Sequence, residues 1–187
     1  FCFWALEFAP MKIVAAGASG FLGEPIVQRL LARGDDVVVL TRNPAHVRVG
    51  RPLQWDARSQ GAWSDEAASA DVVINLAGEN IGEGRWTETR KKRMVSSRLD
   101  ATAAIVEALR SDPTRAGTLI SASAVGFYGD RGDELLDESS SRGAGFLAEL
   151  VEQWEAAVRP AESLARLVVI RFGVVLGVDG GALKKMM

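Results

Sequence analysis

The residues best suited to chemistry form a glycine-rich segment near the start of the chain. Glycine recurs at every third position as Gly17, Gly20 and Gly23. This spacing suits a pyrophosphate-binding loop, in which the first glycine permits a tight turn, the second lets the backbone approach the phosphates, and the third lets a helix pack closely on a sheet. An anion there would meet the free N–H groups and the dipole of the helix N-terminus. A glycine triplet alone is often only a turn, so the prediction depends on the flanking elements.

Those elements are expected from the apolar pattern. Residues 12–16 form a short β-rich run that stops at the glycines. Over residues 21–33, apolar side chains recur at helical spacing, at Leu22, Ile26, Leu30 and Leu31. Residues 37–40 are four consecutive aliphatics, as in a strand buried on both faces of a parallel sheet. A strand, a helix and a second strand are therefore predicted up to Thr41.

The alternation continues along the chain. We expect further strands at 52–55, 72–76, 118–123 and 167–172, and helices at 65–69, 87–110 and 146–158. The inner face of the long helix is expected at Val95, Leu99, Thr102, Val106 and Leu109, and that of the last helix at Leu147, Leu150, Val151, Trp154 and Val158. This order predicts an α/β fold with a doubly wound parallel sheet, the Rossmann fold. The polar loop at 126–145 is expected to border the active cleft.

The end of the second strand distinguishes between two dinucleotides. NAD-preferring folds usually place an acidic residue there to bind the ribose 2′-hydroxyl. This chain has Thr41 and Arg42, whereas Asp35 and Asp36 lie at the wrong end of the strand. The guanidinium fork of Arg42 suits the 2′-phosphate of NADP, so we expect NADP(H) to be preferred over NAD(H). The alternative is that Arg42 is a solvated surface arginine.

Two other strand ends are expected to contact the cofactor. Asp56 follows the third strand and can accept a hydrogen bond from the adenine amino group. The small residues after the fourth strand let a cofactor pass close to the backbone, although either segment alone would also suit an ordinary turn. The expected cofactor-binding set is Gly17, Ser19, Gly20, Phe21, Leu22, Gly23, Thr41, Arg42, Asp56, Leu76, Ala77, Gly78, Ser121 and Ala122.

Together with the glycine loop, four segments resemble the short-chain dehydrogenase/reductase superfamily in its atypical or extended, epimerase-like branch. They are NLAGENI at 75–81, GRWT at 84–87, SRLDAT at 97–102 and RFGVVLG at 171–177. More narrowly they are similar to epimerase family proteins, which are related to nucleoside-diphosphate-sugar epimerases. Such proteins extend into a smaller substrate lobe, so the resemblance implies that residues 11–187 are an NAD(P)-binding domain truncated at its C-terminal end.

The resemblance also implies a catalytic Ser or Thr after the fifth strand, and a Tyr followed four residues later by a Lys that lowers its pKa for proton exchange during hydride transfer. Ser123 matches the first position. Phe146 and Leu150 occupy the other two, and neither transfers a proton.

We rank three candidate catalytic residues, of which Ser123 is first and the other two would replace the missing Tyr and Lys. Tyr128 is second, although it is equally well explained as a packed loop aromatic. Glu79, which follows the fourth strand and could face the nicotinamide or the substrate, is third. Glu149 lies near the vacant tyrosine position, but such a residue is more often on a solvated helix face.

Composition limits the other functions. The 187 residues, of which 48% are apolar and 25% charged, suit one globular domain. A net charge of −2 gives no general attraction to nucleic acid, and the basic run at 90–93 is expected to be a solvated helix face. One cysteine and one histidine exclude a disulfide framework and make a metal cluster implausible, which favours a reducing, cytoplasmic location. The apolar residues 1–10 are too few to span a membrane and are expected to be an N-terminal extension.

Two functions remain open at this stage. The first is an NADP-dependent oxidoreductase or sugar-nucleotide epimerase with an unorthodox acid/base, acting on a small molecule such as a nucleotide sugar. The second is a non-catalytic NADP(H)-binding sensor or regulatory module. The missing Tyr and Lys favour the second, while Ser123 and the long loop favour the first, to which we lean. The two long helices are compatible with a homodimer, and packing on the sheet explains their apolar faces equally well.

Overall fold

The computed structural model describes residues 9–112, 117–177 and 180–181. Its strands are β1 (Lys12–Ala16), β2 (Asp36–Thr41), β3 (Arg51–Gln54), β4 (Val72–Asn75), β5 (Thr118–Ala124), β6 (Arg166–Phe172), β7 (Leu176–Gly177) and β8 (Gly180–Gly181). Its α-helices are α1 (Gly23–Ala32), α2 (Ala62–Ala68), α3 (Glu88–Arg110) and α4 (Phe146–Val158), and three short 3₁₀ turns are η1 (Pro44–His46), η2 (Val125–Tyr128) and η3 (Arg159–Ser163). The predicted extension at residues 1–10 lies outside the described residues, apart from Ala9 and Pro10.

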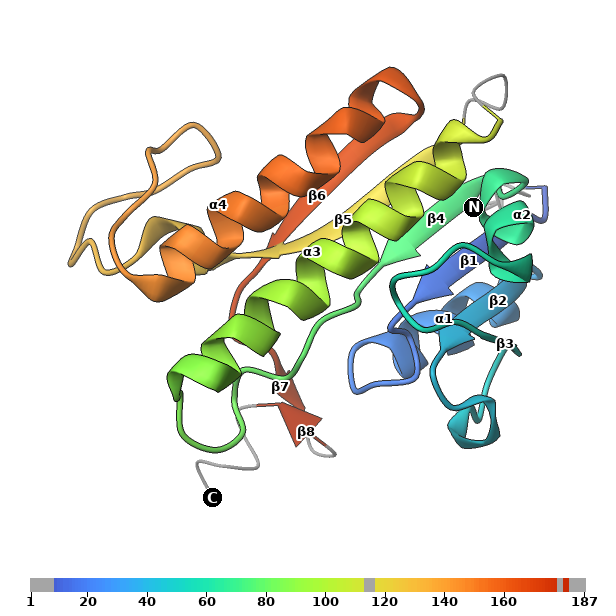
Figure 1. The fold of residues 1–187 in the computed structure, drawn as a ribbon, viewed down its shortest axis with the longest axis horizontal. Helices are drawn as coiled ribbons and strands as arrows, with labels where there is room; N and C mark the ends of the chain where they lie inside the picture. The colour runs from blue at the N-terminus through green and yellow to red at the C-terminus, as the bar shows by residue number, and fades with distance from the viewer. Residues whose placement is uncertain (1–8, 113–116, 178–179, 182–187) are drawn as a thin grey trace, which may run out of the picture.

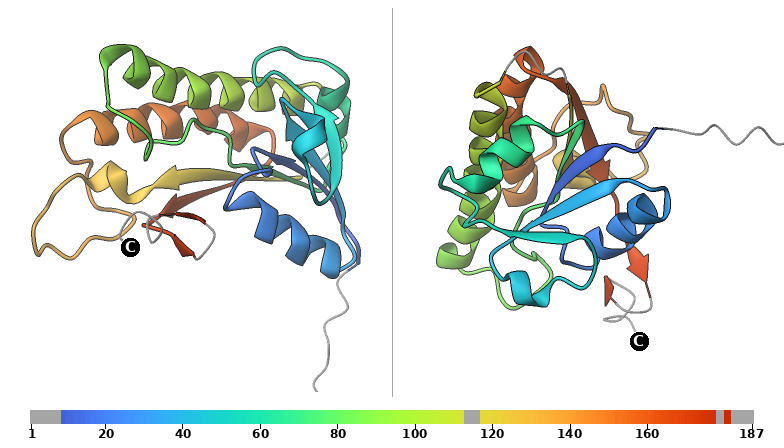
Figure 2. Two further views of the ribbon diagram at one scale, coloured as in Figure 1. Left: turned by 90° about the horizontal axis from the view of Figure 1, so that it is seen from below. Right: turned by 90° about the vertical axis from the view of Figure 1, so that its right-hand side faces the viewer.

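Six parallel strands form one sheet in the order β3-β2-β1-β4-β5-β6. Helix α1 packs on one face, while α2, α3 and α4 cover the other, where α3 and α4 lie side by side (Figures 1 and 2). The predicted doubly wound fold is therefore confirmed. The strand order reverses between β1 and β4, and ligands of such sheets bind in the crevice at this point.

Strand β2 shows why the sheet is buried from both sides. Val38 and Leu40 pack into the core beneath α2 and α3, and Val37 and Val39 pack into the core beneath α1. All four side chains are buried. An unbroken aliphatic run is the pattern such a central strand requires, because successive side chains point to opposite faces.

The long helix α3 buries the expected face only in part. Thr102 and Val106 are buried as expected, whereas Val95 and Leu99 are only half-buried. The adjacent stripe of Met94, Ala101 and Ile105, which was not expected to face inward, is fully buried. Two adjacent apolar stripes satisfy the helical period, and the sequence alone does not say which of them faces the sheet. The hairpin of β7 and β8 was not expected either, because two-residue strands carry no periodic pattern.

Two further features concern the described residues only. None of their helices is both long and apolar enough to cross a membrane. Nor do they bring together three or more His, Cys, Asp or Glu side chains in a way that would hold a metal ion.

Candidate functional site

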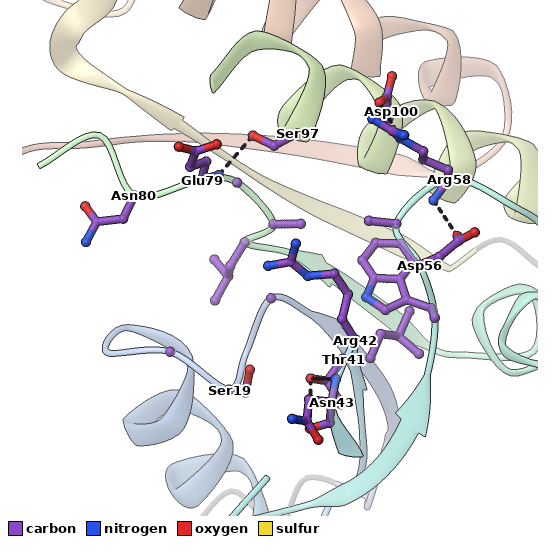
Figure 3. A pocket seen from close by; sticks show the side chains of 18 of the residues that line it. Ser19, Thr41, Arg42, Asn43, Asp56, Arg58, Glu79, Asn80, Ser97 and Asp100 are labelled. Carbon is purple, nitrogen blue, oxygen red and sulfur yellow. Dashed lines mark hydrogen bonds and ion pairs between the residues drawn. The ribbon is translucent and has the colours of Figure 1, made fainter. Parts of the chain in front are cut away.

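A cavity of about 980 Å³ opens at the carboxyl edge of the sheet (Figure 3). Its walls are the glycine loop after β1, the segments that follow β2, β3 and β4, and the first half of α3. Of the expected cofactor-binding residues, it is lined by Gly17, Ser19, Gly20, Thr41, Arg42, Asp56, Leu76, Ala77 and Gly78, together with the catalytic candidate Glu79. Phe21, Leu22, Gly23, Ser121 and Ala122 are not among the lining residues.

The three loop glycines are constrained in different ways. Gly17 has a φ of 70°, and a β-carbon there would lie 2.7 Å from the backbone nitrogen of Ala77. A β-carbon on Gly23 would overlap the backbone of Ala18. On Gly20 it would meet nothing closer than 3.9 Å. The fold itself therefore requires the first and third glycines, while the free side of Gly20 adjoins the cavity.

The start of α1 offers backbone donors beside this loop. Leu22, its N-cap residue, supplies no side-chain hydrogen bond to the first turn. The first N–H groups of a helix have no partner within the helix, and together with its dipole they favour an anion. The local structure thus suits the phosphate site that the sequence predicts.

After β2 the chain makes a turn that presents Arg42. Thr41 is buried, and its Oγ1 accepts a hydrogen bond from the backbone nitrogen of Asn43 at 3.2 Å. Arg42 is exposed and extends into the cavity (Figure 3). His46, the only histidine of the chain, lines the same cavity within 3.4 Å of the Asn43 amide. Sequence reasoning gave this histidine no role in the site.

After β3, Asp56 both lines the cavity and fixes a turn. Its Oδ1 accepts hydrogen bonds from the backbone nitrogens of Ser59 at 2.7 Å and Arg58 at 2.8 Å. These bonds hold the pKa of the Asp56 carboxyl below its usual range. The carboxylate is therefore ionised near neutral pH, with one oxygen already engaged by its own loop.

Glu79 enters the cavity between two arginines. Its carboxylate lies 3.3 Å from Nε of Arg93 and 3.7 Å from Nε of Arg90, and its backbone nitrogen donates to Ser97. The Arg90 side chain is only 12% exposed and donates to the carbonyl of Asn80. The expected solvated face at 90–93 is thus wrong for Arg90, which packs against the segment after β4. The carboxylate of Glu79 therefore forms ion pairs with two arginines of α3 at the cavity wall.

Ser123 and Tyr128, the other two catalytic candidates, meet in a partly buried network away from the cavity lining. Ser123 Oγ donates to Glu155 Oε1 at 2.5 Å. Arg171 binds the same carboxylate in a bidentate manner, at 2.8 and 2.9 Å, and donates to the Tyr128 hydroxyl at 2.8 Å. Ser123 is 3% exposed and Tyr128 is 9% exposed. The structure therefore joins these two candidates to each other and not to Glu79.

Neither position of the missing Tyr and Lys carries a side chain that transfers protons, although the Lys91 ammonium lies 5.4 Å from the centroid of the Phe146 ring. The Phe146 ring lies edge-on to Trp86, with a centroid distance of 5.7 Å, and Leu150 is buried in the core between α3 and α4. None of the residues of the 126–145 loop lines this cavity, so the expectation that the loop borders the active cleft stays a prediction. The start of the loop folds as η2, and its later part returns to it through a bond from Gly143 N to Phe127 O.

Comparison with known proteins identifies the family. The model of the NAD-dependent epimerase/dehydratase family matches residues 13–159. The chain belongs to this family. An epimerase family protein from Mycobacterium bovis is 39% identical in an alignment of 178 residues that covers 93% of this chain and 57% of that protein. This family member thus spans a little over half the length of that curated relative.

Two solved structures resemble this family member over nearly its whole length. The human epimerase family protein SDR39U1, crystallised with NADPH, is 36% identical with a TM-score of 0.80, and the match covers 94% of this chain and 58% of the human one. A nucleoside-diphosphate sugar epimerase from Corynebacterium glutamicum is 35% identical with a TM-score of 0.79, covering 95% of this chain and 37% of that protein.

Sequence reasoning overlooked the α3 wall of the site in this family member. Arg93, Ser96, Ser97 and Asp100 all line the cavity. They recur at intervals of three or four residues, which is the signature of one helix face. That polar stripe was visible in the sequence, but the nearby apolar stripes dominated the interpretation of the helix.

Proposed function

We propose that this chain is an NADP(H)-binding, epimerase/dehydratase-like or oxidoreductase protein whose active site lacks the usual Tyr and Lys. One observation carries the proposal: the glycine loop and Arg42 line the same cavity at the switch point of the sheet. Gly20 would admit the pyrophosphate, and the Arg42 guanidinium would bind the 2′-phosphate. The NADPH in the human relative supports this assignment.

The cofactor would supply a hydride acceptor or donor, and the chain's own groups would orient it and move protons. Glu79 is the catalytic candidate that lines the cavity. Its ion pairs with Arg90 and Arg93 hold the carboxylate at the cavity wall, where it would exchange a proton with the substrate. A small-molecule substrate, with a nucleotide sugar as the candidate, belongs to this proposal.

A non-catalytic NADP(H)-binding module is the second candidate. It is favoured by the apolar side chains of Phe146 and Leu150, and by the hydrogen bonds that engage Ser123 and Tyr128 within the protein. The two candidates share the cofactor site and differ only in turnover. Sustained hydride exchange with any member of a carbonyl and nucleotide-sugar panel, lost in Glu79→Gln, would exclude the pure binding module.

Calorimetric titration with NADPH and NADH tests the cofactor assignment. We expect wild type to prefer NADPH. Arg42→Ala should weaken the affinity for NADPH by about tenfold, because a charged hydrogen bond to phosphate contributes roughly 1.5–3 kcal/mol. The affinity for NADH should stay unchanged. Gly20→Val should abolish binding of both, because its side chain would fill the phosphate space.

Arg48→Ala is the matched control, since Arg48 is exposed on the same segment and does not line the cavity. It removes the same charge and should leave both affinities unchanged. If Arg48→Ala and Arg42→Ala weakened NADPH binding equally, Arg42 would act only through its general positive charge and not as a ligand of the 2′-phosphate. Absence of NADPH binding to the wild type would refute the proposal.

A further inference from the structure

The turn after β3 combines an unusual backbone with a position in the cavity wall. Ala57 has a φ of 66°, and within the described ranges it is the one residue other than glycine with a positive φ. Side chains other than glycine rarely adopt this conformation, and it persists where the surroundings enforce it. Here Asp56 enforces it, by accepting from the backbone nitrogens of the two residues that follow Ala57.

The result of this turn is the placement of Arg58. Its Nε donates to Asp100 Oδ2 on α3 at 2.8 Å. Both residues line the cavity, so the ion pair connects the segment after β3 with the α3 wall (Figure 3). The Arg58 side chain is 67% exposed and that of Asp100 is 37% exposed. An exposed pair of this kind contributes little to stability, so stability alone does not account for the strained turn.

The position of Arg58 corresponds to one end of the proposed cofactor. In a sheet of this strand order, one mononucleotide half lies over β1, β2 and β3, and the pyrophosphate lies at the glycine loop. With Arg42 at the ribose phosphate, the segment after β3 is left for the adenine. A guanidinium is planar and weakly hydrated, and it stacks well on an aromatic face.

We propose that Arg58 is an adenine-binding residue, which covers one face of the purine ring, and that Asp100 is the positioning residue that holds its guanidinium there. This inference rests on the proposed binding of NADP(H). Arg58 would contact the adenine base, which NADP and NAD share. Arg42 would bind the 2′-phosphate, which only NADP carries.

The test is a calorimetric titration of the full chain with NADPH, NADH and 2′,5′-ADP. Arg58→Ala should weaken the affinity for each of the three ligands by about tenfold, and the ratio of NADPH to NADH affinity should stay constant. Arg58→Lys keeps the charge but not the plane, and should recover only part of the loss. Arg42→Ala should instead change the ratio.

Asp100 is tested through a double-mutant cycle. Asp100→Asn should weaken the affinity for the three ligands by about threefold. The double variant Arg58→Ala with Asp100→Asn should bind them no more weakly than Arg58→Ala alone. Arg110→Ala is the matched control, because it removes an exposed, ion-paired arginine from the end of α3. All variants should unfold at the wild-type temperature within a few degrees, which separates a binding effect from lost structure.

Each other outcome decides against a stated claim. Unchanged or tighter NADPH binding by Arg58→Ala would overturn the adenine contact while leaving the proposed function intact. A loss confined to NADPH and 2′,5′-ADP would make Arg58 a phosphate ligand and would equally overturn it. Additive losses in the double mutant would remove the positioning role of Asp100. A wild type that binds none of the three ligands would refute the proposed function, and this inference with it.

Discussion

Glu155 is the residue on which the partly buried network of Ser123, Tyr128 and Arg171 depends. Its side chain is 12% exposed and accepts three hydrogen bonds, one from Ser123 and two from Arg171. Burial by itself raises the pKa of this carboxyl, but the bonds from Arg171 and Ser123 outweigh burial and hold the pKa below its usual range. Ionised Glu155 therefore stabilises the folded chain.

The sign of the effect gives a pH dependence. Because the folded pKa lies below the unfolded value of about 4.3, the stabilisation is complete above that pH and is lost as the pH falls through the folded pKa. At pH 7, Glu155→Gln should lower the free energy of unfolding by about 2 kcal/mol, since Arg171 loses its buried counter-charge. Below about pH 4 the difference between wild type and variant should shrink, as measured by urea unfolding. Glu107→Gln, on an exposed pair, is the control, and a constant difference across the pH range would contradict this account.

At the scale of single residues, the sequence predicted local motifs better than contacts between residues that are far apart in the chain. The glycine loop was predictable because its three residues are neighbours with a fixed spacing. The link from Ser123 to Glu155 spans 32 positions, and that from Tyr128 to Arg171 spans 43. Arg171 was noticed as part of a motif, but only the fold shows which carboxylate and which phenol it contacts.

Among the elements, those bounded by glycine or proline and with a single apolar face were predicted best. Helix α4 has the predicted bounds, because a glycine precedes it, Pro160 follows shortly after, and a single stripe of its residues is buried. Helix α3 also has nearly the predicted bounds, and Thr87 caps its start. Its buried face was predicted only in part, since burial against the sheet is a property of the packed molecule.

Thr102 illustrates that difference. The sequence places it on an apolar face, yet its Oγ1 accepts hydrogen bonds from Asn75 Nδ2 at 3.1 Å and Trp154 Nε1 at 3.2 Å. The residue is fully buried, and it joins the end of β4 to α3 and α4. Asn75 also accepts from the backbone of Ala77, which lines the cavity, so this contact helps to shape the site.

Two substitutions separate shape from hydrogen bonding at Thr102. Valine has almost the same shape but leaves two buried donors without an acceptor, so Thr102→Val should cost about 3 kcal/mol of unfolding free energy. Thr102→Ser keeps the acceptor and loses one methyl group, at about 1 kcal/mol. Urea unfolding followed by circular dichroism measures both. A valine variant at least as stable as the serine variant would show that packing alone matters at this position.

For the whole molecule, the alternation of elements predicted the layers, but it did not specify the strand order. The order depends on which strands pair over long sequence distances, as β1 does with β4. That pairing creates the switch point and brings the segments after β2, β3 and β4 together around one cavity. The site is therefore a property of the complete sheet, and no single motif contains it.

A ligand held by so many segments should stabilise the whole fold. At a free NADPH concentration of 100 times Kd, linkage raises the free energy of unfolding by about 2.7 kcal/mol. For a chain of 187 residues this corresponds to a rise in Tm of roughly 5–10 °C. NADH at the same concentration should give a smaller rise. Gly20→Val should show none, although its own Tm should stay near that of the wild type because a β-carbon has room there. A full NADPH shift in Gly20→Val would place the cofactor away from the glycine loop.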